Sequence, residues 1–215
     1  MVDVTGGGED DCAHGGMIDA SLAAEGLYTS PRRVPVEHEM KIPVANLAAV
    51  RARLAELGAA PLHPPTLEQN WVLDDETGSR VAAGQLVRVR RYGATSTLTF
   101  KGAATFAAGV KSRRELETRV GDAAELLAVL AALGLEPKRR YEKRREVWRS
   151  GAVTVALDET PMGSFVELEG PPGDLRPLAV RLALEPDAAV AGNYLELWEA
   201  FRTAHPEAGE DMLLP

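Results

Sequence analysis

Cysteine is almost absent from this chain of 215 residues, and Cys12 is its single example. One cysteine excludes an internal disulfide and any metal site built from several thiolates. This composition is typical of a protein in a reducing compartment, and we expect it to act in the cytoplasm. Hydrophobic residues make up 45% of the sequence, which is enough for a sizeable core in one domain.

The chain also lacks long hydrophobic runs. No segment approaches 18 consecutive apolar residues, so we expect no membrane-spanning helix. Residues 5–16 are rich in glycine and acids and lack the apolar region of a secretory signal. We expect residues 1–33 to be a flexible N-terminal extension, 34–204 to form the folded domain, and 205–215 to be a C-terminal tail with frayed last residues.

The chain as a whole has fewer basic than acidic residues. The net charge is −8, which argues against nucleic acid or an anionic membrane surface as a partner. The charges are unevenly distributed, however. Between Arg80 and Arg149 lie 16 Lys and Arg against seven Asp and Glu, whereas the rest of the chain holds eight against 25. The middle of the chain could therefore bind an anion.

Charged residues alternate in the first predicted strand, which runs from Val36 to Val44. Side chains alternate between the two faces of a strand, so Glu37, Glu39 and Lys41 share one face. Two neighbouring carboxylates repel each other unless water or a cation compensates them. This face is therefore either exposed to solvent or a place where a metal and an anion bind together.

Similar alternation recurs along the chain. We expect further strands near residues 69–73, 85–92, 96–101, 112–120, 138–149, 152–158 and 164–170. Helices are expected near residues 47–57, 123–133, 174–184 and 188–203, and Pro61, Pro64 and Pro65 indicate a loop. Many of these strands have one apolar and one charged face, which favours a closed barrel with a polar lumen, although an open sheet is the alternative.

The charged strand faces carry two sets of side chains. The acids are Glu37, Glu39, Glu115, Glu117, Asp158, Glu167 and Glu169. The bases are Lys41, Arg88, Arg90, Lys101, Arg113, Lys143 and Arg145. Carboxylates without cysteine suit Mg²⁺ or Mn²⁺, and Arg and Lys suit phosphate oxygens. The two sets together predict a site for a nucleotide or polyphosphate.

These motifs, taken in order, resemble the CYTH superfamily, also called triphosphate tunnel metalloenzymes, which includes class IV adenylate cyclases and thiamine triphosphatase. The resemblance covers about residues 36–201. It rests on Glu37-x-Glu39-x-Lys41, Gln69-Asn70-Trp71 with Asp74-Asp75, Arg88-x-Arg90, Thr99-Phe100-Lys101-Gly102, Arg113-x-Glu115-x-Glu117, Lys143-x-Arg145-x-x-Trp148, and Asp158 followed by Glu167-x-Glu169. The first motif alone is weak, but the ordered set is specific.

The resemblance implies an α+β fold, in which an antiparallel eight-stranded β-barrel with flanking helices forms a triphosphate tunnel. It implies that the acids of the first and last motifs hold Mg²⁺ or Mn²⁺, namely Glu37, Glu39, Glu167 and Glu169, with Asp158 as a further candidate. The implied phosphate ligands are Lys41, Arg88, Arg90, Lys101, Arg113, Lys143 and Arg145. Glu115 and Glu117 are expected to support them. Catalytic roles are expected for Glu39 and for Lys143, the latter matching a proposed general base.

Three functions remain open at this point. The first is a metal-dependent triphosphatase, in which water attacks the terminal phosphate of an inorganic or organic triphosphate. The second is a class IV-like adenylate cyclase, and the third is a non-catalytic polyphosphate- or nucleotide-binding module. The chain has no His-Phe pair near Gln69-Asn70-Trp71 and no lysine before Tyr194, which weakens the case for a cyclase. We expect a monomer or homodimer whose partner is a small-molecule triphosphate or nucleotide.

Overall fold

The computed structural model describes residues 35–215, so the predicted extension over 1–33 lies outside the described residues. Its strands are β1 (Val36–Val44), β2 (Ala60–Asp74), β3 (Leu86–Tyr92), β4 (Thr95–Lys101), β5 (Thr105–Ala107), β6 (Val110–Val120), β7 (Glu136–Ser150), β8 (Val153–Thr160) and β9 (Gly163–Glu169). Its helices are α2 (Leu47–Glu56), α3 (Ser79–Ala82), α4 (Ala123–Ala132), α5 (Pro172–Arg181) and α6 (Tyr194–Ala204), with a 3-10 turn at Pro186–Ala188. None of the helices in this part of the chain is long and apolar enough to cross a membrane.

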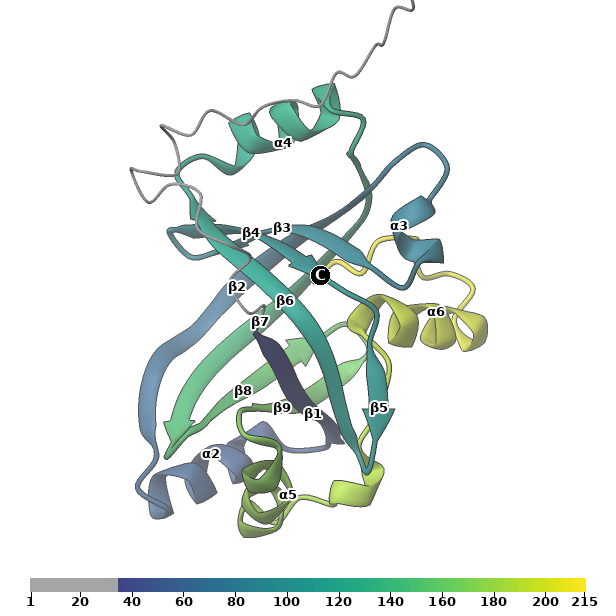
Figure 1. The fold of residues 1–215 in the computed structure, drawn as a ribbon. Helices are drawn as coiled ribbons and strands as arrows, with labels where there is room; N and C mark the ends of the chain where they lie inside the picture. Colours follow the sequence, from purple (N-terminus) through teal and green to yellow (C-terminus); the bar gives the residue numbers. More distant parts are fainter. Residues whose placement is uncertain (1–34) are drawn as a thin grey trace, which may run out of the picture. The chain divides into compact units, whose positions relative to one another are not determined.

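The strands form a closed antiparallel barrel (Figure 1). The order is β1-β9-β8-β7-β2-β3-β4-β6, and β1 also pairs with β6, which closes the ring of eight. The short strand β5 adds to the edge of β6 as a ninth strand. The predicted α+β fold with an eight-stranded barrel and flanking helices is confirmed.

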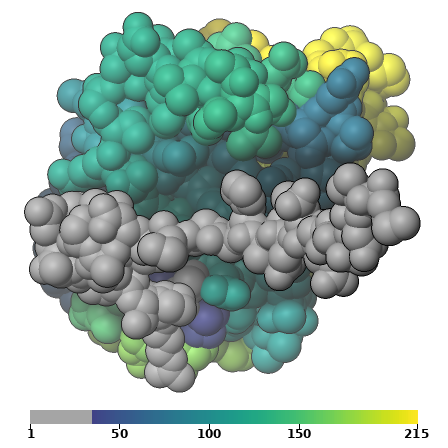
Figure 2. Space-filling view, turned by 45° about the horizontal axis from the view of Figure 1, so that its top comes forward, coloured from purple at the N-terminus to yellow at the C-terminus, as the bar shows by residue number. Residues whose placement is uncertain are grey.

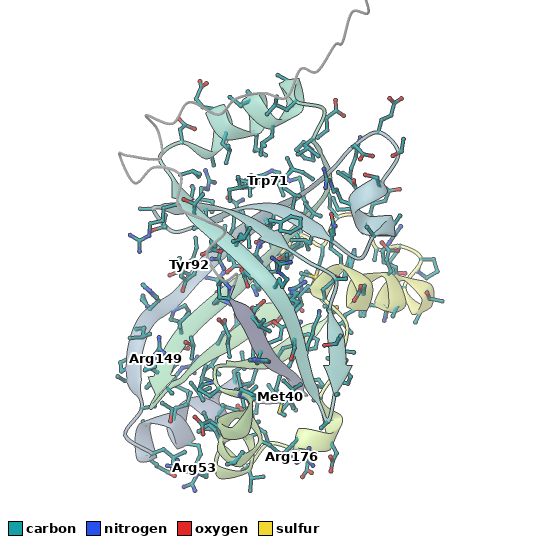
Figure 3. All side chains as sticks on the ribbon, viewed as in Figure 1. Met40, Arg53, Trp71, Tyr92, Arg149 and Arg176 are labelled. Carbon is teal, nitrogen blue, oxygen red and sulfur yellow. The ribbon has the colours of Figure 1, made fainter. Side chains whose placement is uncertain are left out.

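The apolar core lies outside the barrel wall. On β1, Met40 and Ile42 are almost fully buried and pack in a cluster with residues of α2 and α5. A second cluster joins β2 and β3 to α4, and Trp71 lies beneath that helix (Figure 3). Because neighbouring side chains alternate, packing these apolar residues outward turns the charged residues of the same strands into the lumen.

Helix α4 packs on β2 and β3 with only one side, and its other side is exposed. Leu130 is its single buried residue, whereas Val129 and Leu133 on the outer side are 55% and 73% exposed. This part of the chain forms the teal surface at the top of the space-filling view (Figure 2). Asp122 is the N-cap of this helix, and its side chain accepts hydrogen bonds from the backbone N–H groups of Ala124 and Glu125.

Helix α6 and the C-terminal segment pack against one end of the barrel. Tyr194, Trp198 and Met212 form a buried cluster with residues of β2, β7 and β9. Met212 is fully buried, and its backbone is bonded to both Arg140 and Glu142 of β7, with N···O distances of 3.1 and 2.7 Å. The expectation that the last residues are frayed is therefore wrong at Met212.

The strand β2 corrects a second expectation, because it includes the prolines that were predicted to form a loop. Its pairing with β7 shifts register between Pro61 and His63 and again between His63 and Thr66. Irregularities of this kind accommodate proline, which cannot donate to the ladder. The last helix also begins at Tyr194 instead of residue 188, and neither β5 nor α3 was predicted.

Candidate active site

The barrel encloses a cavity of about 470 Å³. All of the predicted phosphate ligands line it: Lys41, Arg88, Arg90, Lys101, Arg113, Lys143 and Arg145. The predicted acids that line it are Glu37, Glu39, Glu115, Glu117, Glu167 and Glu169. Side chains from distant parts of the sequence therefore converge in one lumen, and Asp158 is the one predicted site residue outside its lining.

Acidic residues of β1 and β9 lie on neighbouring strands of the barrel wall. In the register of these strands Glu39 is directly opposite Glu169, and Lys41 is opposite Glu167. Like charges that face each other across a sheet are destabilising unless a cation lies between them. Burial raises the pKa of Glu169, and the nearby Glu37 carboxylate raises it further. Within the described residues Glu167 pairs with Lys41 and Glu39 with Lys111, whereas Glu169 makes no ion pair.

Lys101 joins two other acids of the lumen. Its Nζ lies 2.8 Å from Glu37 Oε2 and 2.9 Å from Glu115 Oε2, and Arg113 Nε lies 3.5 Å from the same Glu37 oxygen. Burial and the hydrogen-bonded Glu37 raise the pKa of Glu115 to about 7. Burial acts against ionisation of Glu37 too, but Lys101 and Arg113 lower its pKa overall. Below about pH 7 Glu37 is therefore the charged member of this pair.

Lys41 is held between β1, β9 and the segment before α6. Its Nζ lies 3.2 Å from Glu167 Oε1 and donates a hydrogen bond to the carbonyl oxygen of Gly192 at 3.1 Å. Burial opposes its charge, but the carboxylates of Glu167 and Glu39 raise its pKa overall. The same amine lies 4.4 Å from the ring centre of Tyr194. Lys41 is thus a fixed cation at the wall of the lumen.

Asp158 lies on the inward face of β8, because its neighbour Leu157 packs in the outer cluster, and it is fully buried beneath cations that line the lumen. Its carboxylate contacts Lys143 Nζ at 3.0 Å and Arg145 at 2.6 Å, and it accepts a hydrogen bond of 2.6 Å from the Tyr194 hydroxyl. Every one of these partners lines the cavity. The Asp158 carboxylate already accepts hydrogen bonds from these three side chains, so it is well placed to orient them. Unlike the other predicted acids, it does not line the cavity itself.

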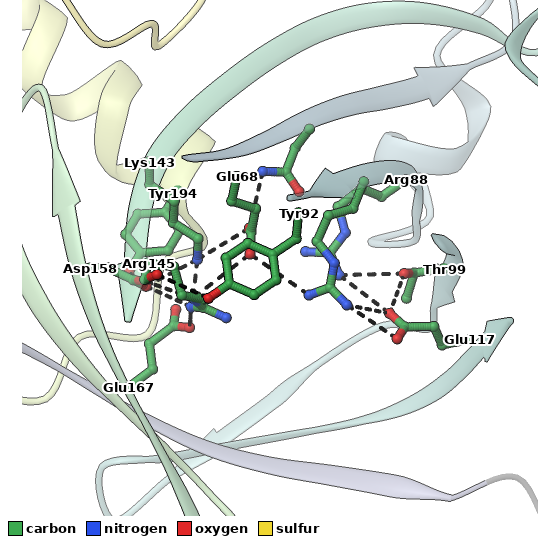
Figure 4. A network of polar contacts seen from close by, with 12 residues as sticks. Glu68, Arg88, Tyr92, Thr99, Glu117, Lys143, Arg145, Asp158, Glu167 and Tyr194 are labelled. Atoms are coloured by element: carbon green, nitrogen blue, oxygen red, sulfur yellow. Dashed lines mark hydrogen bonds and ion pairs between the residues drawn. The ribbon is translucent and has the colours of Figure 1, made fainter. Parts of the chain in front are cut away.

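Glu68 links two groups of cations (Figure 4). It is 1% exposed and lies 3.6 Å from Lys143, 3.8 Å from Arg145 and 3.9 Å from Arg90. These neighbouring charges hold its pKa well below the usual value although burial opposes this. On the other side Arg90 pairs with Glu117 at 3.0 Å. The network therefore fixes the cations in position before any ligand binds.

The lumen offers carboxylates that suit a divalent cation. Within the described residues no three His, Cys, Asp or Glu side chains are already spaced to hold a metal. The donors are nevertheless suitable, because Glu37, Glu39 and Glu169 offer carboxylate oxygens in one cavity. Glu39 also lies 3.6 Å from Lys111, which partly balances its charge. The residues fit a hard cation that needs few protein ligands and completes its shell with water or phosphate.

Sequence reasoning missed several residues of this site. On β2, Glu68 and Asn70 are buried and share one face of the strand, whereas their neighbours are exposed or half-buried. On β6, Lys111 shares a face with Arg113. Extending the predicted strands 69–73 and 112–120 by one residue would have identified Glu68 and Lys111, whereas Asn70 lay within a predicted strand and was not assigned to the site. Tyr194 both packs in the core and lines the lumen.

Comparison with solved structures shows the same fold in other proteins. A candidate adenylate cyclase from Vibrio parahaemolyticus matches with a TM-score of 0.70 and 18% identity over 78% of this chain and 99% of that one. A protein from Pyrococcus horikoshii matches with a TM-score of 0.66 and 22% identity, covering 77% and 99%. A candidate adenylyl cyclase from Hippeastrum, described as having a dominant triphosphatase activity, matches with a TM-score of 0.59 and 17% identity, covering 77% and 96%.

No curated protein sequence matches this chain significantly. The family model of the CYTH domain matches residues 36–176, which is more than half of the chain and includes β1 to β9. The predicted resemblance is therefore confirmed, and this protein belongs to the CYTH domain family.

Proposed function

We propose that this protein uses a divalent cation to hydrolyse the terminal phosphate of an inorganic or organic triphosphate. One observation carries the proposal. Seven Lys and Arg side chains and a group of carboxylates line a single lumen, with the acids of β1 and β9 on one wall. A triphosphate needs several fixed cations along its length, and a metal that binds its oxygens needs carboxylates nearby.

The metal would be held by Glu37, Glu39 and Glu169, with Glu167 beside them. Mg²⁺ or Mn²⁺ would neutralise charge that develops on the phosphate oxygens. The structural neighbour from Hippeastrum, with its described triphosphatase activity, supports the choice of reaction. Asp158 is the least suitable of the predicted metal ligands, because its oxygens already accept from Lys143, Arg145 and Tyr194.

The cations would align the phosphates. Arg88, Arg90 and Arg145 carry planar groups that can donate two hydrogen bonds to one phosphate. Lys41 and Lys101 are 4% and 5% exposed and pair with Glu167 and Glu37, so they would act as fixed charges. Because these groups are already positioned by acids, little reorganisation is needed when charge shifts in the transition state.

Lys143 is our candidate to accept a proton from the attacking water. It would have to be neutral in that role, whereas here its amine lies 3.0 Å from Asp158 and 3.8 Å from Glu167. The Lys143→Arg variant separates a role as proton acceptor from a role in phosphate binding, because arginine keeps the positive charge but is effectively always protonated. A large fall in kcat with little change in KM would support the base role. Unchanged kcat would restrict Lys143 to phosphate binding.

A second function, cyclisation of ATP, is favoured by the neighbour from Vibrio parahaemolyticus, which is described as a candidate adenylate cyclase. Product analysis separates the two reactions. The protein is incubated with Mg²⁺ or Mn²⁺ and with ATP, thiamine triphosphate or inorganic triphosphate. Release of phosphate without cyclic AMP is the expected result. Cyclic AMP with pyrophosphate would contradict hydrolysis, and binding without turnover would contradict both reactions.

A further inference from the structure

Lys111 is a buried lysine on β6, where this strand pairs with both β1 and β5 (Figure 1). It is 7% exposed, and in the register of the strands it lies directly opposite Glu39 of β1. Its amine lies 3.6 Å from Glu39 Oε1, which is its single ion pair within the described residues. This distance is too long for a hydrogen bond, so the contact is one of charge alone.

The other three buried lysines of the site have more or closer partners. Lys101 contacts two carboxylates at 2.8 and 2.9 Å, and Lys143 contacts three carboxylates within 3.8 Å. Lys41 has a carboxylate at 3.2 Å and donates a hydrogen bond of 3.1 Å to a backbone carbonyl oxygen. Lys111 is therefore the least firmly held of the four, and its charge is balanced mainly by Glu39.

Glu39 is also one of the carboxylates that would hold the divalent cation in the proposed function. The ammonium group of Lys111 and a metal ion at Glu39 carry charge of the same sign. Beside one carboxylate they repel each other, so each weakens the binding of the other. Glu39 can therefore be neutralised well by Lys111 or by the metal, but not by both together.

The surroundings of Lys111 allow its amine to change partner. Lys111 shares a face of β6 with Arg113, and Arg113 lines the lumen. Both residues also line a second cavity of about 790 Å³ beside the lumen. A lysine ammonium is carried on a flexible four-carbon stem and binds phosphate as a point charge. A buried amine that loses its carboxylate needs another anion, and a triphosphate in the lumen would supply one.

We propose that Lys111 exchanges partners during ligand binding. It neutralises Glu39 while the lumen is empty, and it binds a phosphate oxygen once a divalent cation occupies Glu39. Lys111 thus weakens metal binding to the empty lumen and strengthens the binding of triphosphate that follows. The inference rests on the proposed function in placing the metal at Glu39 and the triphosphate in the lumen, but it does not depend on hydrolysis.

The test is the Lys111→Met variant, because methionine keeps most of the length of the side chain and removes its charge. Lys138→Met is the matched control. Lys138 lines the same second cavity and carries the same charge, but it pairs with Glu136 at the surface, at 3.4 Å. Mn²⁺ is titrated alone by calorimetry, and inorganic triphosphate is then titrated with Mn²⁺ at saturation. Kd is measured in both experiments, so neither needs turnover.

Lys111→Met should change the two affinities in opposite directions. Mn²⁺ alone should bind about tenfold more tightly, because the amine no longer competes for Glu39. Triphosphate with Mn²⁺ should bind about tenfold more weakly, because one phosphate ligand is lost. Lys111→Gln, which also lacks the charge, should behave in the same way, and Lys138→Met should change either affinity less than about twofold. A variant that is merely misfolded would lose affinity for both ligands.

Changes in the same direction, or an unchanged affinity for either ligand, would overturn the inference. Opposite changes without phosphate release from any triphosphate would support the inference and contradict the proposed hydrolysis. Phosphate release by the wild type, together with parallel changes in Lys111→Met, would leave the proposed function intact and contradict the exchange of partners. The two failures are therefore distinguishable.

Discussion

Glu68 shows how single residues hold the lumen together. Its carboxylate is almost fully buried and lies within 4 Å of Lys143, Arg145 and Arg90. Its Oε2 atom makes no hydrogen bond within the described residues. The carboxylate therefore acts mainly through its charge, which offsets the repulsion among three buried cations.

Glu68→Gln should strongly reduce the free energy of unfolding. Removal of one partner from a buried charge cluster typically costs about 3–5 kcal/mol, because the remaining charges stay buried and uncompensated. Glu56→Gln is the control, since Glu56 pairs with Arg53 at the surface and is 64% exposed. Its loss should cost less than about 1 kcal/mol. Urea unfolding at pH 7 measures both, and equal values for the two variants would contradict the structural role of Glu68.

Arg90 and Arg91 are neighbours on β3 that face opposite sides of the barrel wall. Arg90 lines the lumen, whereas Arg91 is exposed and bonds to Gln69 on the outside. Arg90→Ala should raise KM for inorganic triphosphate about tenfold or more, because a charged hydrogen bond to phosphate is lost. Arg91→Ala should change KM less than about twofold. Steady-state kinetics of both variants provides the comparison, and a normal KM in Arg90→Ala would remove this residue from the phosphate site.

Glu115 should make stability depend on pH. In the unfolded chain a glutamate has a pKa of about 4.3, whereas burial and Glu37 raise the pKa of Glu115 to about 7 in the folded state. Between these values the folded state retains a proton that the unfolded state has released. The contribution of Glu115 to the free energy of unfolding therefore decreases as pH rises through this window.

Glu115→Gln removes that titration. The free energy of unfolding of the wild type minus that of the variant should fall by about 1–3 kcal/mol between pH 4.5 and 7.5. Urea unfolding of the metal-free proteins at several pH values measures the difference. A constant difference across this range would show that Glu115 has an ordinary pKa.

The charged residues of the lumen could be predicted from sequence, but their partners could not. Alternation along each strand placed Glu37, Glu39 and Lys41 on one face, as the structure shows. It could not tell that Asp158 is buried beneath Lys143 and Arg145 while Glu169 lines the cavity, because this depends on the register of β7, β8 and β9. Roles in binding and catalysis remain predictions.

At the scale of elements, the C-terminal segment is part of the barrel packing. Met212 is fully buried, whereas the adjacent Leu213 is 41% exposed. Met212→Ala should lower the free energy of unfolding by about 2–5 kcal/mol, as large-to-small substitutions in cores do. Leu213→Ala should cost less than about 1 kcal/mol. Thermal or urea unfolding tests both, and a neutral Met212→Ala would indicate that this segment is not stably packed.

Most helices and strands were predictable, and the exceptions have physical causes. Alternation identified the strands with charged faces, and the helix predicted over residues 123–133 is α4. The prolines of β2 indicated a loop, because local sequence does not show that a bulge and the partner strand β7 can accommodate them. The pairing of Met212 with β7 is likewise a tertiary contact that no local pattern indicates.

At the scale of the whole molecule, closure of the barrel creates the site. The pairing of β1 with both β6 and β9 brings Glu37 beside Lys101 and Arg113, and Glu39 opposite Glu169. Alternation alone left an open sheet as an alternative, and the family resemblance indicated the barrel. The central claim that follows is that one lumen binds a divalent cation and a triphosphate together.

Calorimetric titration of inorganic triphosphate, with and without Mg²⁺, tests this claim most directly. Wild-type protein should bind triphosphate more tightly when Mg²⁺ is present, by about tenfold or more, because the cation links the carboxylates to the phosphate oxygens. Glu39→Gln should lose most of this gain while remaining folded, and Glu56→Gln should keep it. An affinity that is the same with and without Mg²⁺ in the wild type, or an undiminished gain in Glu39→Gln, would contradict the account.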